Sequence, residues 1–349
     1  MSMQVLAYFT LGPILQITCA QMLSLGLRHA ENSPCVGSLI VIGAGIQLLL
    51  VQAPTFKHVT PVACLSLFIT VLRQVLVYIQ MARYDMFNNC HANYDIPSGD
   101  NSQVYNLFIS LGTVAFMFGG HGYIPEEVKE MRNPKKYYLR AVNWTYFIIV
   151  FFYLIMMIPA YYVWGSWTSP ILVDNLPDDS ITTVIIYLTY VWTLTEMVIP
   201  TFVLCLGIEI VFFKLSPHIH LNTKDNTGWL GVHPFIWRIL NRTSIVGLEL
   251  FFALLLQDGG IGNIQALVGA LGFGALTYWL PCLIELVTSQ RFRIVNIILA
   301  LCGLTITVGG MYTAIVGIAQ ESAGNLFGRG TCERIQMLNA SQGPCNYNI

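Results

Sequence analysis

Long apolar segments recur along the whole chain and restrict it to one structural class. Nine runs of about 20 mostly apolar residues are present, each long enough to cross the hydrocarbon core of a bilayer as a helix. A soluble protein of this length would show shorter apolar runs broken by polar faces. Charged residues make up only 10% of the sequence, far below the roughly 25% of soluble domains. We therefore expect an all-α integral membrane protein with helices near 3–27, 36–53, 60–82, 104–124, 141–165, 181–213, 234–257, 260–288 and 293–319.

The distribution of basic residues predicts the orientation of these helices, because Lys and Arg accumulate in cytoplasmic loops. With a cytoplasmic N-terminus, twelve of the 17 basic residues fall on the cytoplasmic side: Lys57, Lys129, Arg132, Lys135, Lys136, Arg140, Lys214, Lys224, Arg238, Arg242, Arg291 and Arg293. Four fall on the opposite side, and one lies inside a span. Nine spans then place a C-terminal tail, residues 320–349, in the lumen or outside the cell.

Cysteines and a glycosylation triplet fit that placement of the tail. Cys332 and Cys345 lie in it and are candidates for a disulfide, and Asn339 begins an Asn-Ala-Ser acceptor that could carry a glycan only on this side. Cys35 and Cys90 fall in loops on the same side, so a second disulfide is an open alternative. The other five cysteines lie in spans, where packing as small apolar residues is the favoured interpretation.

The sequence shows no feature of several other functional classes. It contains no nucleotide-binding glycine motif, no basic nucleic-acid patch, and no His or Cys cluster with metal-ligand spacing. The longest loops are about 20 residues, so no separate soluble domain is expected. We therefore expect neither an enzyme nor a nucleic-acid-binding protein, and no bound cofactor or metal.

One predicted helix is interrupted by glycines. In the stretch AFMFGGHGYIPEEVKEMRNPKK, residues 115–136, three glycines fall within positions 119–122, and each costs roughly 1 kcal/mol relative to Ala inside a helix. Pro125 follows, and proline fits the first turn of a new helix. The pattern predicts an upper half-helix, an unwound Gly-Gly-His-Gly link, and a short lower half-helix with acidic residues at its start and basic residues at its end.

An unwound link cannot face lipid, because each unpaired backbone N–H or C=O in hydrocarbon costs several kcal/mol. In secondary transporters such links form the substrate site, where helix ends and free carbonyls bind the charged groups of the substrate. An amino acid carries both charges, so we expect the link to bind one through Phe118, Gly119, Gly120, His121 and Gly122. The alternative is a glycine kink that lets a neighbouring helix pack closely.

His121 is the only one of the seven histidines that falls inside a predicted span. An imidazole titrates near neutral pH, so His121 could load a proton from an acidic lumen and release it to the cytoplasm. It could equally stay neutral and hydrogen-bond the unwound backbone. Both interpretations stay open.

Two acidic residues lie deep in apolar spans, where a carboxylate is costly and usually functional. Glu196 and Glu249 are therefore further candidates for proton coupling, with a protonated or paired structural acid as the alternative for each. Arg73 is a natural partner for one of these acids, unless its side chain snorkels to the membrane surface.

Hydroxyl groups surround Glu196 in the sequence. Thr193 is a candidate substrate-binding residue, and Thr195 and Tyr190 could also offer hydroxyls to a ligand. Interhelical packing is the favoured interpretation for all three. Gln16, after a proline in the first span, is a minor candidate.

Several stretches are similar to a known transporter family. FGGHGYIPEEVKEMRNPKKY resembles the sixth-helix signature of the amino acid/auxin permease family. WRILNRTSIV at 237–246, LVGALGFGALTYWLPCLIEL at 267–286 and GGMYTAI at 309–315 resemble later parts of that family. The strings VNWTY and DNLP, between 142 and 177, lean toward its vacuolar and vesicular branch.

The resemblance implies an inverted-repeat secondary transporter fold in one transmembrane domain, residues 1–319. Residues 1–100 would be the remainder of the first repeat, 101–290 the second repeat and 291–319 the last helix. The nine spans then correspond to family helices three to eleven, without the first helix that carries the other half of the substrate site. A truncated sequence, a splice form and a non-transporting paralogue would each account for this, and truncation is favoured.

Together these inferences predict a proton-coupled secondary transporter of small, neutral amino acids, with the proton as the coupling ion and its gradient as the driving force. The resemblance implies a vacuolar, lysosomal or vesicular membrane, with the plasma membrane as the alternative. The expected partners are an amino acid substrate and bilayer lipid, and the sequence does not predict the oligomeric state. The alternative functions are a non-transporting amino acid sensor and an inactive truncated paralogue.

Overall fold

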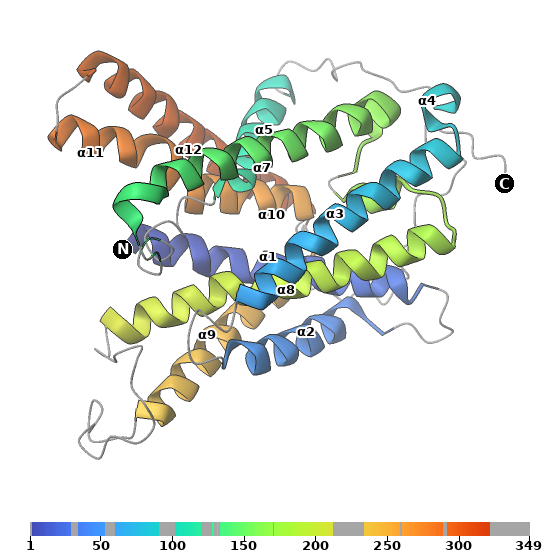
Figure 1. Cartoon of the computed structure of the whole chain (residues 1–349), viewed down its shortest axis with the longest axis horizontal. Coiled ribbons are helices and arrows are strands. Elements are labelled where there is room, and N and C mark those ends of the chain that lie inside the picture. Colours follow the sequence, from blue (N-terminus) through green and yellow to red (C-terminus); the bar gives the residue numbers. More distant parts are fainter. Residues whose placement is uncertain are drawn as a thin grey trace.

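The computed structural model describes residues 2–28, 34–52, 60–90, 102–119, 128, 131, 133–169, 171–211, 234–258, 260–288 and 292–321. Within these ranges the regular elements are helices and no β-strand is present (Figure 1). The first half contains α1 (Ser2–Gly26), α2 (Val36–Val51), α3 (Thr60–Arg83), α4 (Met86–Asn89), α5 (Ser102–Met117), α7 (Pro134–Trp164), η3 (Gly165–Trp167) and η4 (Leu172–Asn175). The second half contains α8 (Ser180–Val211), α9 (Pro234–Leu256), α10 (Ile261–Val268), η6 (Gly269–Phe273), η7 (Ala275–Trp279), α11 (Leu280–Thr288) and α12 (Arg293–Glu321).

The predicted membrane helices are present. Seven segments are long and apolar enough to cross a membrane, and the shorter apolar helices α2 and α5 have 16 residues each. All nine coincide with predicted spans, which confirms the all-α membrane class. The main boundary error is at α7, which begins at Pro134 rather than near residue 141. Proline is well suited to the first turn, because the N–H that it lacks would have no partner there.

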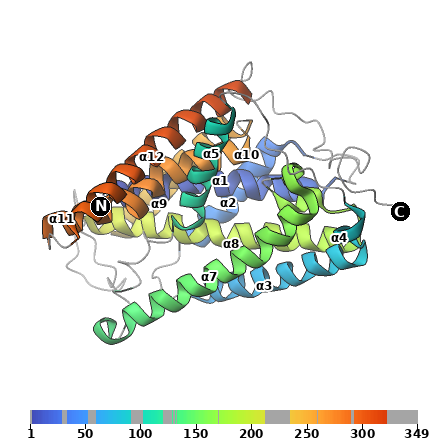
Figure 2. The same cartoon turned by 90° about the horizontal axis from the view of Figure 1, so that it is seen from above.

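Four helices form the centre of the molecule. Each of the six pairs among α1, α2, α8 and α9 is in contact, and we call these helices the four-helix scaffold. α1 and α8 are buried along 56% of their most apolar windows, against 17% for α3, α7 and α12. Figure 2 shows α12 along one edge of the bundle and α3 with α7 along the opposite edge, with the scaffold between them.

The outer helices expose large apolar side chains, as expected for surfaces that face lipid. Phe147 and Ile158 of α7 and Ile294 and Val308 of α12 are each more than half exposed. Lipid tails are as apolar as these side chains, so contacts between helices depend on close packing and polar links more than on removal of apolar surface from water. The polar links inside this bundle therefore determine how its helices associate.

The predicted span 260–288 is not one regular helix. Two π-helical segments, η6 and η7, separate α10 from α11. Backbone contacts with neighbouring helices occur here: a Cβ on Gly269 would collide with the carbonyl oxygen of Gly112 in α5. One on Gly272 would lie 2.9 Å from the Cα of Ala7 in α1. The wider π-helical turns thus occur where the glycines bring this segment onto α5 and α1.

Gly269→Ala should lower the thermal unfolding midpoint of the detergent-solubilised protein. The added methyl group has no space beside Gly112, and overpacking of this kind costs about 1–3 kcal/mol. Gly247→Ala in α9 is the matched control, because its Cβ would meet nothing within 4 Å, and alanine favours a helix over glycine. Equal melting of the wild type and Gly269→Ala would contradict the backbone contact between α5 and η6.

Candidate functional site

The first half of the predicted broken helix is α5, which ends at Met117, directly before Phe118 and the glycines. Gly119 is buried, and a Cβ there would overlap the ring of Phe273 in η6. The rest of the predicted link, Gly120, His121 and Gly122, and the start of the predicted lower half-helix lie outside the described residues. Their part in substrate binding stays a prediction.

Tyr153 of α7 connects the end of α5 with a buried acid. Its hydroxyl donates a hydrogen bond of 3.0 Å to the carbonyl oxygen of Met117, one of the carbonyls that the end of a helix leaves without a partner. Its ring packs edge-to-face against Phe118, with the ring centroids 5.5 Å apart. Tyr153 also interacts electrostatically with Glu196 of α8. The beginning of the link and Glu196 therefore lie in the same region.

Glu196 contacts α3. The hydroxyl of Ser66 donates a hydrogen bond to its carboxylate. The guanidinium of Arg73 lies 4.4 Å from the centroid of the Trp192 ring, one helical turn from Glu196, and interacts electrostatically with its carboxylate. This arrangement favours Arg73 as the partner of a buried acid over snorkelling. Pro200, four residues after Glu196, cannot donate a hydrogen bond to the carbonyl of Glu196.

The threonines near Glu196 bond to their own helix. Thr193 is fully buried and donates to the carbonyl oxygen of Thr189 at 2.8 Å. Thr195 donates to the carbonyl oxygen of Trp192 at 2.7 Å. These bonds agree with the packing interpretation, and a role for Thr193 in substrate binding stays a prediction.

Glu249 lies at a separate place, inside the four-helix scaffold. Its Oε2 accepts a hydrogen bond of 2.9 Å from Gln47, and the hydroxyl of Thr201 lies 3.0 Å from both of its oxygens. Gln47 also donates to Thr201 at 2.8 Å and accepts from Gln16 at 2.6 Å. We call Gln16, Gln47, Thr201 and Glu249 the Glu249 cluster. One residue comes from each of α1, α2, α8 and α9.

A buried ion pair joins α8, α9 and α2 at one end of the bundle, called here the Glu209 end. Arg242 donates to Glu209 at 2.8 and 3.3 Å and to the carbonyl oxygen of Val51 at 2.6 Å. Both charged side chains are 1% exposed, and Arg238 lies 3.7 Å from the same carboxylate. Arg242, counted among the basic residues of the cytoplasmic side, lies inside α9 rather than in a loop, and the side of the membrane that it faces stays a prediction. A carboxylate on a neighbouring helix allows this arginine to lie inside the protein.

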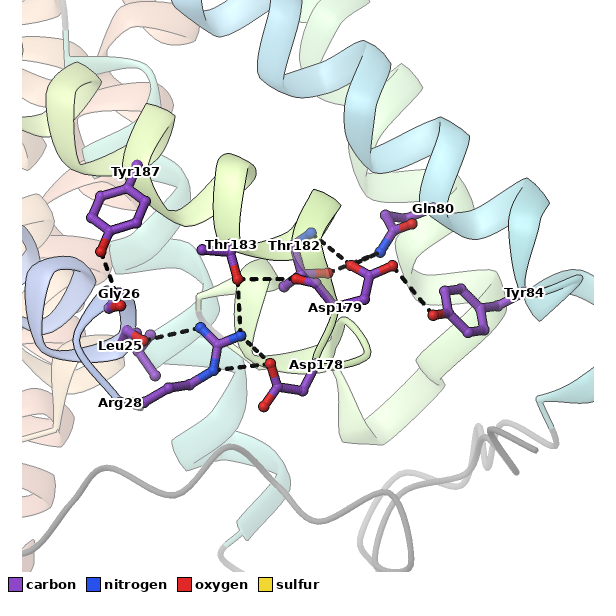
Figure 3. Close-up of polar contacts among 10 residues, drawn as sticks. All are labelled: Leu25, Gly26, Arg28, Gln80, Tyr84, Asp178, Asp179, Thr182, Thr183 and Tyr187. Carbon is purple, nitrogen blue, oxygen red and sulfur yellow. Dashed lines mark hydrogen bonds and ion pairs between the residues drawn. The ribbon is translucent and has the colours of Figure 1, made fainter. Parts of the chain in front are cut away.

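A second polar cluster lies at the opposite end, called here the Asp179 end (Figure 3). Asp179 precedes α8 and accepts hydrogen bonds from the N–H of Thr182 at 2.8 Å and from Gln80 at 2.7 Å, which caps the helix. Arg83 and the hydroxyl of Tyr84 contact its other oxygen. Partial burial alone would raise the pKa of Asp179, but the hydrogen bonds from Thr182, Gln80 and Tyr84 lower it below the ordinary value.

The same cluster holds the end of α1 against α8. Arg28 forms an ion pair with Asp178 and donates to Thr183 at 3.3 Å, and Tyr187 donates to the carbonyl oxygen of Gly26 at 3.0 Å (Figure 3). Ion pairs of this kind at exposed positions contribute about 0–1 kcal/mol each. Their effect here is to position α1 on α8 rather than to add much stability.

Asp174 lies in η4, between α7 and α8, and is mostly buried. Its Oδ2 accepts a hydrogen bond of 3.1 Å from Ser169, while its Oδ1 is buried with no hydrogen-bond partner. Burial raises the pKa of Asp174 to about 6, although the bond from Ser169 acts in the opposite direction. The residue therefore titrates in the range that separates neutral from acidic compartments.

The cysteines divide as the sequence allowed. Cys35 and Cys90 are both disulfide-bonded, which favours the second disulfide that the sequence left open. The five cysteines of the predicted spans are free. Cys332, Cys345 and Asn339 lie outside the described residues, so the disulfide and the glycan predicted for the tail stay predictions.

The sequence analysis identified Glu196 and Glu249 but missed Glu209 and Asp174 and most of the partners of these acids. Ser66, Tyr153 and Thr201 are ordinary polar residues in apolar helices, and nothing local distinguishes them. Gln47 was detectable, because it is the only strongly polar side chain in α2. Gln16, a minor candidate, is part of the Glu249 cluster.

Comparison with known proteins agrees with the membrane architecture. A family model described as "Transmembrane amino acid transporter protein" matches residues 2–320, nearly the whole chain. No solved structure matches the chain.

Asp174, which lies near the Asp179 end, should make the free energy of unfolding depend on pH. The unfolded carboxyl releases its proton near pH 3.8 and the folded one near pH 6, so the folded state holds the extra proton between these values. The free energy of unfolding should then fall by about 2–3 kcal/mol as the pH rises from 4 to 6. Asp174→Asn should remove this contribution, and Ser169→Ala should extend it to higher pH. Thermal unfolding midpoints between pH 4 and 7 measure the effects of both variants. If the midpoint changes with pH in the same way in the wild type and in Asp174→Asn, Asp174 is not the group that titrates.

Proposed function

We propose that this chain, which belongs to the transmembrane amino acid transporter family, moves small neutral amino acids across a membrane together with protons. The family to which the chain belongs supports amino acid transport as its activity. The connection from the end of α5 through Tyr153 to Glu196 carries the proposal of coupling, because it joins the predicted substrate link to a buried group that can bind a proton.

The substrate would bind at the link that begins with Phe118 and Gly119. The freed carbonyls at the end of α5 suit an ammonium group, and the N-terminus of the predicted lower half-helix suits a carboxylate. Phe118 packs against Tyr153, and Gly119 has no space for a methyl group beside Phe273. This crowding supports a small substrate.

Glu196 would carry the coupling proton. When Glu196 is ionised, Arg73 and the hydrogen bond from Ser66 stabilise its charge. Protonation removes that charge and weakens its interaction with Arg73. Tyr153 lies close to Glu196 and also donates a hydrogen bond to Met117, so a movement at Glu196 would reach the end of α5 through this side chain. His121 is the second proton-binding candidate, and the link would move with α5 against the four-helix scaffold.

The Asp179 end would face the lumen or the cell exterior. Cys35 precedes α2 and Cys90 follows α4, both at this end, and disulfides persist in oxidising compartments. In the topology predicted from the sequence, most basic residues belong to the opposite side, as expected for the cytoplasm. With the resemblance to the vacuolar and vesicular branch, this supports the membrane of an acidic organelle.

Glu196→Gln should separate exchange from proton-driven uptake. In proteoliposomes that contain the full chain, an inward proton gradient should accelerate saturable uptake of radiolabelled small neutral amino acids by the wild type. Glutamine cannot release a proton, so the variant should lose this acceleration while it still exchanges labelled for unlabelled substrate across the membrane. Ser66→Ala, which removes the hydrogen bond to Glu196, should shift the pH dependence of uptake without abolishing it.

Thr305→Val is the control, because Thr305 is exposed on α12 and bonds only to its own helix in the contacts described. Absence of saturable uptake by the wild type would reject transport by this chain and leave an amino acid sensor or an inactive paralogue, which ligand binding would separate. Gradient-driven uptake by Glu196→Gln at the wild-type rate would reject Glu196 as the coupling residue. Unchanged uptake in His121→Ala would do the same for His121.

A further inference from the structure

Glu249 is buried without a counter-ion. It is 0% exposed, forms hydrogen bonds with the side chains of Gln47 and Thr201, and packs against the backbone at Gly12, whose Cβ would collide with its carboxyl group. Among the described residues, no Lys, Arg or His forms an ion pair with it. An isolated carboxylate transferred from water into such a place is strongly destabilised, so the site favours a neutral acid.

Glu209 provides an internal comparison on the same scaffold. It is as deeply buried as Glu249, but Arg242 donates two hydrogen bonds to it and Arg238 lies close to it. Glu196 likewise has Arg73 within electrostatic reach. The bundle therefore supplies a cation to a buried acid at two places, from α9 to Glu209 and from α3 to Glu196, and supplies only amide and hydroxyl groups at Glu249.

The charged and titratable groups that pack around Glu249 do not change this conclusion. Tyr8 lies one turn before Gly12 in α1, and Cys205 lies one turn after Thr201 in α8. Both are neutral in their ordinary form. Arg242, two turns away on α9, directs its guanidinium at Glu209 and at the carbonyl oxygen of Val51.

The hydrogen bonds of the Glu249 cluster accommodate a proton with no change in the positions of the oxygen and nitrogen atoms. Gln47 donates to Oε2 of Glu249, so this oxygen can be the carbonyl of a neutral acid. Thr201 lies 3.0 Å from Oε1 and donates to the ionised group; a hydroxyl can also accept, so rotation of its O–H lets it accept from the acid O–H at that position. Gln47 and Gln16 complete a chain from the acid to α1. A sodium ion would need several oxygens directed at one point, whereas here the amide N–H groups of Gln47 occupy that space.

We propose that Glu249 binds one proton permanently and, as a neutral acid, joins α1, α2, α8 and α9 into one rigid body. In this arrangement the proton of Glu249 is part of the fold and does not enter the transport cycle. The coupling proton then uses the opposite side of α8, where Glu196 faces α3. This assignment removes Glu249 from the coupling candidates and makes the Glu249 cluster a structural proton site.

Infrared spectroscopy of the purified full chain tests this directly. The wild type at pH 7 should show a C=O band of a protonated carboxylic acid that is absent in Glu249→Gln and present in Glu196→Gln. The band should keep its position in D₂O during turnover with substrate, because a retained proton does not exchange. If Glu249→Gln keeps all the carboxylic acid bands of the wild type, or if the band shifts rapidly in D₂O during turnover, the proposal is wrong.

Stability supplies an independent test that does not depend on transport. Glutamine has the shape of a neutral glutamic acid, so Glu249→Gln should unfold within about 3 °C of the wild type, less than the effect of losing one full hydrogen bond or charge. Glu209→Gln should lower the unfolding temperature by more than Glu249→Gln does, because it leaves Arg242 without its carboxylate. Failure of Glu249→Gln to fold would show that the negative charge is required. Stabilisation by NaCl over choline chloride that Glu249→Gln loses would assign the site to sodium. Either result would reject the proton.

Discussion

The antiparallel packing of α8 against α1 is the contact on which the rest of the structure depends. Four polar clusters of the described bundle are attached to α8: those of Asp179 directly before it, and of Glu196, Thr201 and Glu209 along its length. From Asp179 to Glu209 an α-helix rises about 45 Å, the thickness of a bilayer with its headgroup regions. One helix thus carries the polar groups at both membrane surfaces and at both sites near the centre.

The two central acids differ because they lie on different sides of this helix. Glu196 faces α3, a helix at the edge of the bundle, and has Arg73 nearby and Tyr153 as a connection to α5. The Glu249 cluster lies on the side of α8 that contacts α1, α2 and α9 and has no such connection to α5. Glu196, on one side of α8, can therefore respond to the link, whereas Glu249 is enclosed by the scaffold on the other side.

The sequence predicted what depends on local chemistry and missed what depends on distant partners. Apolar length is a local property, so all nine spans could be identified. Glu196 and Glu249 could be identified because a carboxylate is unusual in such spans. Their partners could not, because Ser66 is 130 residues from Glu196 and Gln47 is 202 residues from Glu249. The burial of Arg242 was missed for the same reason, since its partner Glu209 lies on another helix.

The glycine contact between α5 and η6 has a consequence for motion. Side chains that interlock across an interface must change rotamer before two helices can shift, and a backbone contact at Gly112 and Gly269 has no side chains to disengage. At these two residues, α5, the helix that leads into the link, contacts η6 through backbone atoms and not through interlocked side chains. We therefore expect changes in the tilt of α5 to meet less resistance at these two glycines than on the interdigitated faces of the scaffold.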